Sequence, residues 1–399
     1  MNSVFMLSES IERNEPSKIS CCIIVYMFYE DLLNQCYLYI EQIPEYIDVW
    51  LITSNPKIAL KIKEYISKTN KKNYKVLVKE NRGRDMAALL VTCHDFIMEY
   101  EYLCFVHDKK SLQMGNSNDG CKFMDLIWNN LIGSAGLIEN ILRYLENNRN
   151  IGLLVPPIPY WGNYIGVFVN PWTCNYDNVI NLGNQLRLKK SVCYEKEYVT
   201  IGGAFWCRTD ALRPLFEYKW KLEDFCQEPM ATDGTISHAI ERIFGFVALD
   251  NGYDVLEILN LDYAKLRLCD LQQRFINIVQ DLQRDYLINN IDYMHEEREK
   301  TEELIAYCKN YKNIYIYGAG TYGKQCNDVL KRYGIRTSGF IVSNSLKKSS
   351  SYEGCQVWEF GEIMDQLNDS GIVVAVNKQY QKQILELIKQ NSRIEVFCI

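Results

Sequence analysis

The sequence is short of several features that would assign a function at once. Its four histidines are scattered at His94, His107, His238 and His295, and none of its fifteen cysteines is spaced C-x-x-C. These absences count against zinc sites and thioredoxin-type redox centres. A G-x-S-x-G turn is also missing, which disfavours a serine hydrolase of the nucleophile-elbow type.

Long apolar runs and an excess of positive charge are missing too. The most apolar stretch, 151–171, is interrupted by prolines and falls short of the roughly 18 uninterrupted apolar residues of a membrane span. The net charge of −6 argues against nucleic acid as the main partner. The first twenty residues lack the basic and apolar segments of a secretory signal, so we expect a cytoplasmic protein with reduced thiols.

One segment departs from this acidic character. From Lys57 to Lys79 there are eight lysines and a single acid, Glu64. The pattern fits either a solvated helix face or a patch that touches an anionic membrane leaflet. Peripheral contact with the inner face of the membrane therefore stays open.

The length of 399 residues with a hydrophobic share of 48% predicts at least two folded domains. From Ser20 onwards, short β-rich runs alternate with helical patterns, which indicates an α/β fold with a largely parallel sheet. We expect an N-terminal extension (1–19), a first α/β domain (20–262), a helical connector (263–310) and a smaller Rossmann-like domain (311–399).

Two polar groups follow predicted strands of the first domain, where ligands bind in open α/β sheets. The first group opens a predicted helix after the strand at Val76–Val78 and is a candidate site for a base, sugar or phosphate, although its arginines would also suit a surface. It consists of Asn81, Arg82, Gly83, Arg84 and Asp85.

The second group, His107 to Lys110, follows the predicted strand Tyr102–Val106. Here Asp108 could hold a metal ion or a sugar hydroxyl, beside cations that would stabilise a departing diphosphate. An ordinary turn has the same composition. Asp233, at the start of a predicted helix over 232–244, is either a general base or an N-cap, and it shares a helix face with Ser237 and Glu241.

The last domain carries a glycine motif. Gly318, Gly320 and Gly323 have the G-x-G-x-x-G spacing after a predicted strand, which favours a dinucleotide site. The acid expected at the end of the next strand is replaced by Ser343 and Asn344, so a fold used for packing or assembly is the alternative. An NAD(P)-dependent sugar-modifying enzyme and a non-catalytic assembly module both remain open on these grounds.

Five separated segments resemble the rhamnan synthesis protein F family, bacterial enzymes of cell-wall and lipopolysaccharide O-antigen synthesis. The segments are FYEDLL, ENRGRDMAALL, FVHDKKS, IGGAFWCRTDALRPL and DGTISHAIERIFG, between about residues 20 and 260. The order of these motifs is similar to that of GT-A-type glycosyltransferases. The resemblance implies a GT-A-like, inverting sugar transferase, with rhamnose as the expected sugar, a nucleoside-diphosphate donor and a glycan or lipid-linked glycan acceptor.

The resemblance also implies roles for individual residues. It puts Asn81, Gly83, Arg84, Asp85, His107, Asp108 and Lys109 in the donor pocket, Gly202, Gly203, Phe205 and Trp206 on the acceptor side, and Asp233 in the place of the catalytic acid of related inverting transferases. His107-Asp108-Lys109 stands where D-x-D usually binds a divalent cation. Dependence on Mn²⁺ or Mg²⁺ through Asp108 is therefore open, and Lys109 or Lys110 could do part of the cation's work.

Overall fold

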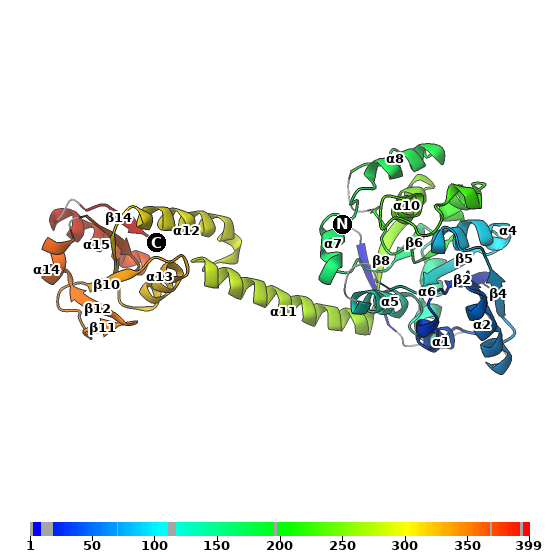
Figure 1. The fold of residues 1–399 in the computed structure, drawn as a ribbon, viewed down its shortest axis with the longest axis horizontal. Helices are drawn as coiled ribbons and strands as arrows, with labels where there is room; N and C mark the ends of the chain where they lie inside the picture. Colours follow the sequence, from blue (N-terminus) through cyan, green and yellow to red (C-terminus); the bar gives the residue numbers. More distant parts are fainter. Residues whose placement is uncertain are drawn as a thin grey trace. The chain divides into compact units, whose positions relative to one another are not determined.

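The computed structural model describes residues 3–8, 19–69, 71–110, 117–194, 198–367, 369–391 and 394–399. The chain divides into two compact units, Met1–Arg267 and Leu268–Ile399 (Figure 1). Each unit is built on its own sheet with helices between the strands, so the predicted α/β class is confirmed. Most of the expected N-terminal extension lies outside the described residues.

The sheet of the first unit has eight strands in the order β1-β8-β6-β7-β5-β2-β3-β4. Only β7 runs antiparallel to its neighbours, β5 and β6. Strands such as β2 are buried along their whole length, as expected for a sheet covered on both faces. The strands are β1 (Ser3–Leu7), β2 (Cys21–Tyr26), β3 (Asp48–Thr53), β4 (Tyr74–Val78), β5 (Tyr102–His107), β6 (Ile151–Val155), β7 (Phe205–Arg208) and β8 (Asp254–Asn260).

Helices connect these strands and cover the sheet. They are α1 (Leu33–Ile40), α2 (Pro56–Thr69), α3 (Arg84–Ala87), α4 (His94–Ile97), α5 (Ser117–Ile132), α6 (Ala135–Asn147), α7 (Ile165–Val169), α8 (Tyr176–Gln185), α9 (Arg213–Phe216), α10 (Ile236–Asp250) and α11 (Leu261–Asp285). The segment between β5 and β6 forms two helices, α5 and α6. The Ser134 side chain accepts a hydrogen bond from the Leu137 N–H and so begins α6 as its N-cap.

Two other helices begin or continue differently from the prediction. The helix expected after Asp85 is α3, then a wider π-helical turn at Ala88–Thr92, then α4. The N-cap of α10 is Thr235, paired with His238 in a capping box. Asp233 therefore lies ahead of the helix and is not its N-cap.

Acidic side chains contact part of the lysine-rich stretch 57–79. Lys61 contacts Glu30 and Lys68 contacts Glu64, while Lys71 and Lys75 contact Glu45 and Asp48. Half of the eight lysines thus have a carboxylate partner, which favours the solvated-face interpretation. In the part of the chain that the structure describes, no helix is both long enough and apolar enough to cross a membrane.

The second unit has a six-stranded sheet in the order β11-β12-β10-β9-β13-β14, parallel except for the pair β11 and β12. Apolar clusters pack against both faces of this sheet. Its strands are β9 (Asn313–Tyr317), β10 (Thr337–Val342), β11 (Ser351–Tyr352), β12 (Cys355–Glu359), β13 (Ser370–Val374) and β14 (Val396–Cys398), and its further helices are α12 (Met294–Lys309), α13 (Thr321–Arg332), α14 (Phe360–Ile363) and α15 (Lys378–Asn391).

Candidate functional site

A cavity of about 790 Å³ lies in the first unit, next to residues that follow the carboxyl ends of β2, β4 and β5. In the strand order, β3 and β4 lie on one side of β2, and the next strand of the chain, β5, lies on the other side. This reversal of strand order is a topological switch point, where open α/β sheets bind ligands. The cavity is lined by charged, polar and aromatic side chains of the turns and of α10. Of the residues predicted from the sequence, it is lined by Asn81, Arg84, Asp85, His107, Asp108, Lys109, Lys110, Gly202 and Asp233.

Asp108 is the most deeply buried acid of the cavity, at 5% exposure. Its Oδ2 accepts hydrogen bonds from the backbone N–H groups of Phe28 (2.8 Å) and Tyr29 (2.7 Å). Burial raises the pKa of Asp108 to about 6, although these two donors and His107 oppose the rise. Its Oδ1 has no hydrogen-bond partner among the described residues. A buried oxygen without a partner in a cavity is a position prepared for a ligand group.

His107 ties three parts of the site together. Its Nδ1 lies 2.9 Å from the Asp108 carbonyl oxygen and its Nε2 lies 2.7 Å from the Gly202 carbonyl oxygen. Asp85 Oδ2 is 3.4 Å from the same Nε2. Both ring nitrogens face carbonyl oxygens, and the tautomer decides which nitrogen donates. The ring thereby joins the turn after β5 to Gly202 and lies beside Asp85.

The arginines of the NRGRD turn have separate tasks. Arg84 binds Glu228 through two parallel contacts, Nε to Oε1 (2.7 Å) and an NH2 contact to Oε2 (3.2 Å). Arg82 points elsewhere, because its guanidinium donates to the carbonyl oxygens of Phe225 and Glu223. Gly83 has a φ of 67°, and a Cβ there would overlap the Phe225 side chain. Arg82 and Gly83 therefore shape the turn and do not line the cavity.

Two lysines bring positive charge to the cavity. Lys110 is paired with Asp31. The Nζ of Lys109 lies 4.6 Å from the centre of the Phe123 ring, and it has no carboxylate partner among the described residues. Because Arg84 and Lys110 are already paired with acids, Lys109 is the cation most available to an anionic ligand.

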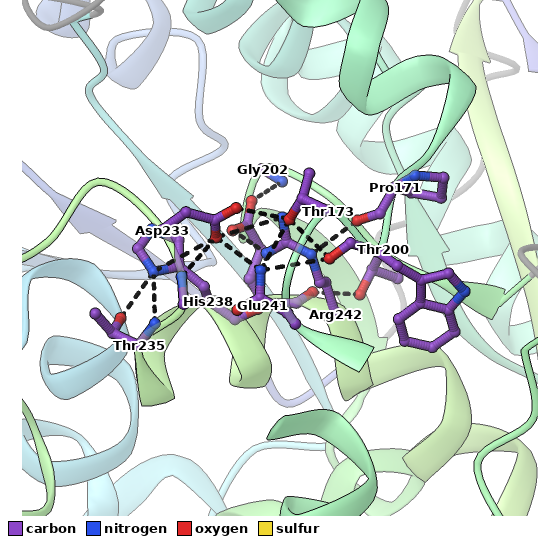
Figure 2. Close-up of polar contacts among 12 residues, drawn as sticks. Pro171, Thr173, Thr200, Gly202, Asp233, Thr235, His238, Glu241 and Arg242 are labelled. Atoms are coloured by element: carbon purple, nitrogen blue, oxygen red, sulfur yellow. Dashed lines mark hydrogen bonds and ion pairs between the residues drawn. The ribbon is translucent and has the colours of Figure 1, made fainter. Parts of the chain in front are cut away.

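Asp233 lies in the hydrogen-bond network drawn in Figure 2. Its Oδ2 accepts from Thr173 Oγ1 (2.6 Å), and its Oδ1 accepts from Asn175 Nδ2 (2.7 Å) and the Gly234 N–H (2.9 Å). Burial raises the pKa of Asp233, but these bonds and the charge of Arg242 outweigh it, so that the pKa is lowered overall. Asp233 is therefore ionised and fixed in orientation.

The first two turns of α10 extend this network. The Thr235 N–H donates to His238 Nδ1, which assigns the proton of the neutral ring to Nε2, and burial lowers the pKa of His238. Glu241 accepts from the Gly202 N–H and lies 3.5 Å from Arg242. Ser237 also lines the cavity, and among the described residues its buried Oγ has no hydrogen-bond partner.

Of the residues predicted for the acceptor side, some lie at the cavity and others lie in the hydrophobic core. Gly202 lines the cavity and Gly203 lies behind it, where a Cβ would meet Met86 and Asp85. Phe205 and Trp206 are buried in the core, and Trp206 Nε1 donates to the Leu131 carbonyl oxygen. The aromatic residues on the cavity are instead Tyr26, Phe28, Tyr29, Phe123 and Tyr164.

Sequence reasoning missed several polar residues of the cavity. No motif or spacing in the sequence pointed to Glu228, His238 or Arg242. The helix face shared with Asp233 did point to Glu241 and Ser237, and both line the cavity. Thr173 comes from the loop region between β6 and α8, which no sequence pattern connected with the site.

The side chains of the cavity offer few ligands for a cation. Among the described residues, no group of three or more His, Cys, Asp or Glu side chains could hold a metal ion. Asp108 is followed directly by two lysines. The side chains therefore do not fit a cation held by the protein alone.

The chain is similar in sequence or structure to several known proteins. Over 245 residues the chain is 25% identical to the uncharacterized protein WxcX of Xanthomonas campestris pv. campestris, in two strains. The alignment covers 60% of this chain and 33% of WxcX, so the chain spans a third of the length of these relatives. A solved structure of the mannosyltransferase PcManGT from Pyrobaculum calidifontis, in complex with GDP-Man and Mn²⁺, matches with a TM-score of 0.34 and 12% identity, over 61% of this chain and 55% of that one.

The match to a family model covers more of the chain. The model of rhamnan synthesis protein F matches residues 2–253, which contain every residue of the cavity described above. The chain therefore belongs to the rhamnan synthesis protein F family.

Proposed function

We propose that the first unit is a GT-A-type glycosyltransferase of bacterial cell-surface polysaccharide synthesis. It transfers a sugar, with rhamnose as the first candidate, from a nucleoside-diphosphate donor to a glycan or lipid-linked glycan. The observation that carries the proposal is that Asp108 and Lys109, which follow β5, line one cavity with Asp233 from a distant part of the sequence. Family membership supports the same class of reaction.

The donor half of the cavity would bind the nucleoside diphosphate and the activated sugar. The partnerless Asp108 Oδ1 suits a sugar hydroxyl, since a buried acceptor gains most from a donor of the ligand. Lys109 would stabilise the charge that develops on the leaving diphosphate. Arg84, already paired with Glu228, would position the turn and would contribute little charge of its own.

The reaction that fits this arrangement is a single displacement with inversion. The acceptor hydroxyl oxygen forms a bond to the anomeric carbon, while the bond from that carbon to the phosphate oxygen breaks and the diphosphate leaves with the electron pair. The hydroxyl proton passes to Asp233, which is ionised and held in place by Thr173 and Asn175. General base catalysis of this kind contributes about a hundred- to ten-thousandfold to the rate.

A thermal-shift panel of UDP-, GDP- and dTDP-linked sugars, each with and without Mn²⁺ or Mg²⁺, tests the proposal. A ligand at a hundred times its dissociation constant adds about 2.7 kcal/mol to the stability, so one nucleotide class should raise the melting temperature clearly. Comparing the arms with and without cation shows whether the donor brings a metal with it. If no nucleotide sugar shifts the melting temperature, the transferase proposal fails and an assembly module takes its place.

A further inference from the structure

Helix α11 carries regularly spaced apolar residues that do not line the transferase cavity. The spacing alternates between three and four residues over three heptads of the helix Leu261–Asp285. An average period of 3.5 residues keeps the apolar positions on one narrow stripe of a supercoiled helix. The residues of this stripe, which we call the α11 seam, are Leu261, Ala264, Leu268, Leu271, Phe275, Ile278 and Leu282.

The middle of the α11 seam is exposed. Leu268 is 68% exposed, Leu271 40%, Phe275 55% and Ile278 57%. Ala264 is the one residue of α11 that the structure describes as buried. Large apolar side chains that follow a strict pattern and yet face water mark an interaction surface.

The positions beside the seam suit a second helix. Five of the six such positions are polar or charged, as found at the edges of coiled coils, and the sixth is Val279; the five are Lys265, Arg267, Gln272, Arg274 and Asp281. In a parallel pair of helices, Arg267 would face the partner's Gln272 and Arg274 would face the partner's Val279, so no like charges meet. Leu266 and Ile276 are exposed apolar residues of α11 outside the seam, so the case for a helix partner rests on the regular spacing of the seam.

We propose that α11 forms a two-stranded coiled coil with a second copy of this chain. A second copy supplies the same seam with the same spacing, which is what knobs-into-holes packing requires. The transferase cavity lies in the first unit, so this proposal stands independently of the proposed function.

Sedimentation velocity of the full chain over a range of concentrations tests the coiled coil. The wild type should form a dimer, and Leu271→Glu and Phe275→Glu should each weaken the dimer by at least tenfold. The control is Gln273→Glu, which adds the same charge on the opposite side of the same helix and should leave the dimer intact. Circular dichroism and melting curves check that each variant is folded.

A second measurement does not depend on substitutions. Two wild-type chains with different affinity tags, expressed together, should be recovered with one another. A wild-type chain that is monomeric at every concentration would overturn the proposal, and this is the result expected if another part of the same chain covers the seam. A Leu271→Glu variant that dimerises as strongly as the wild type would also overturn it.

Discussion

Each of the two units has a glycine turn between a strand and a helix. The side chains around the two turns differ. Gly83 follows β4 and opens α3, with a φ of 67°, while Gly318 follows β9 and precedes α13, with a φ of 126°. Side chains from β5, α10 and several loops meet next to the first turn. Next to the second, the Tyr317 hydroxyl bonds Ser343, and a Cβ on Gly323 would overlap the Gly318 carbonyl oxygen. A glycine turn sets the path of the backbone, and the side chains of other elements decide whether a ligand has groups to bind.

The strongest test of this contrast is the Asp233→Asn substitution in the first unit. It keeps the size of the side chain and removes the base, so turnover should fall at least a hundredfold, while donor affinity measured by calorimetry stays nearly unchanged. Near-normal turnover would remove Asp233 from the base role.

A pH profile separates a base from a merely structural acid. Thr173→Val removes a hydrogen bond to the Asp233 carboxylate, so the lowered pKa of Asp233 should rise. A base must be ionised, and the acidic limb of the kcat/KM profile should therefore move to higher pH. Asn178→Ala is the control, because Asn178 binds the Gly234 carbonyl oxygen of the same turn and does not contact the carboxylate. A limb that stays in place in Thr173→Val would argue that another group titrates.

The next effect concerns the cations of the cavity. Lys109→Ala should weaken the binding of UDP, GDP or dTDP, whichever the thermal-shift panel selects, by about ten- to a hundredfold, as expected for a charge-assisted hydrogen bond of about 1.5–3 kcal/mol. Lys110→Ala is the matched control. It should lose much less, because Lys110 is already paired with Asp31. Equal losses in the two variants would contradict the distinction between them.

At neutral pH, the buried carboxylate of Asp108 should lower the free energy of unfolding of the first unit. Its pKa of about 6 lies above the unfolded value of 3.8, so between these values the folded chain holds a proton that the unfolded chain has lost. Stability then falls as the pH rises through this window. Asp108→Asn should therefore be more stable than the wild type at pH 7.5, by roughly 1–3 kcal/mol, with a smaller difference at pH 5.

Urea unfolding of both proteins at pH 7.5 and pH 5 measures this difference. Asp31→Asn, at an exposed position, is the control and should leave the pH dependence nearly unchanged. An Asp108→Asn chain that is less stable than the wild type at pH 7.5 would show that the buried carboxylate is well compensated in the folded state.

The smallest expected effect belongs to the second unit. A Cβ on Gly320 would meet no atom within 4 Å, so Gly320→Ala should fold normally. We expect nucleotide and nucleotide-sugar affinity to stay within twofold of the wild type. A large loss of affinity for NAD(P) or a nucleotide sugar would instead locate a ligand at this turn, where an added methyl group blocks the close approach of a diphosphate.

The sequence predicted the strands β2 to β6 because each is a short apolar run between polar turns, whereas the edge strand β1 was not predicted. The polar ends of β4 and β5 followed from the same reasoning, since parallel strands bring their carboxyl ends to one edge. Phe205 and Trp206 were misplaced because β7 is buried on both faces, so neither of these neighbouring side chains reaches the cavity. Glu228 and Arg242 were missed because their role depends on contacts with residues more than 60 positions away, for which a single sequence carries no signal.

Strand β1 has a practical consequence for work with shortened chains. Ser3–Leu7 pairs in parallel with β8 along the outer edge of the first sheet, from Leu256 to Asn260. A version that starts at Ser20 would leave the backbone of β8 open to solvent along that border, and unpaired borders of this kind recruit strands from other molecules. We therefore expect the shortened chain to aggregate under conditions in which the full chain does not.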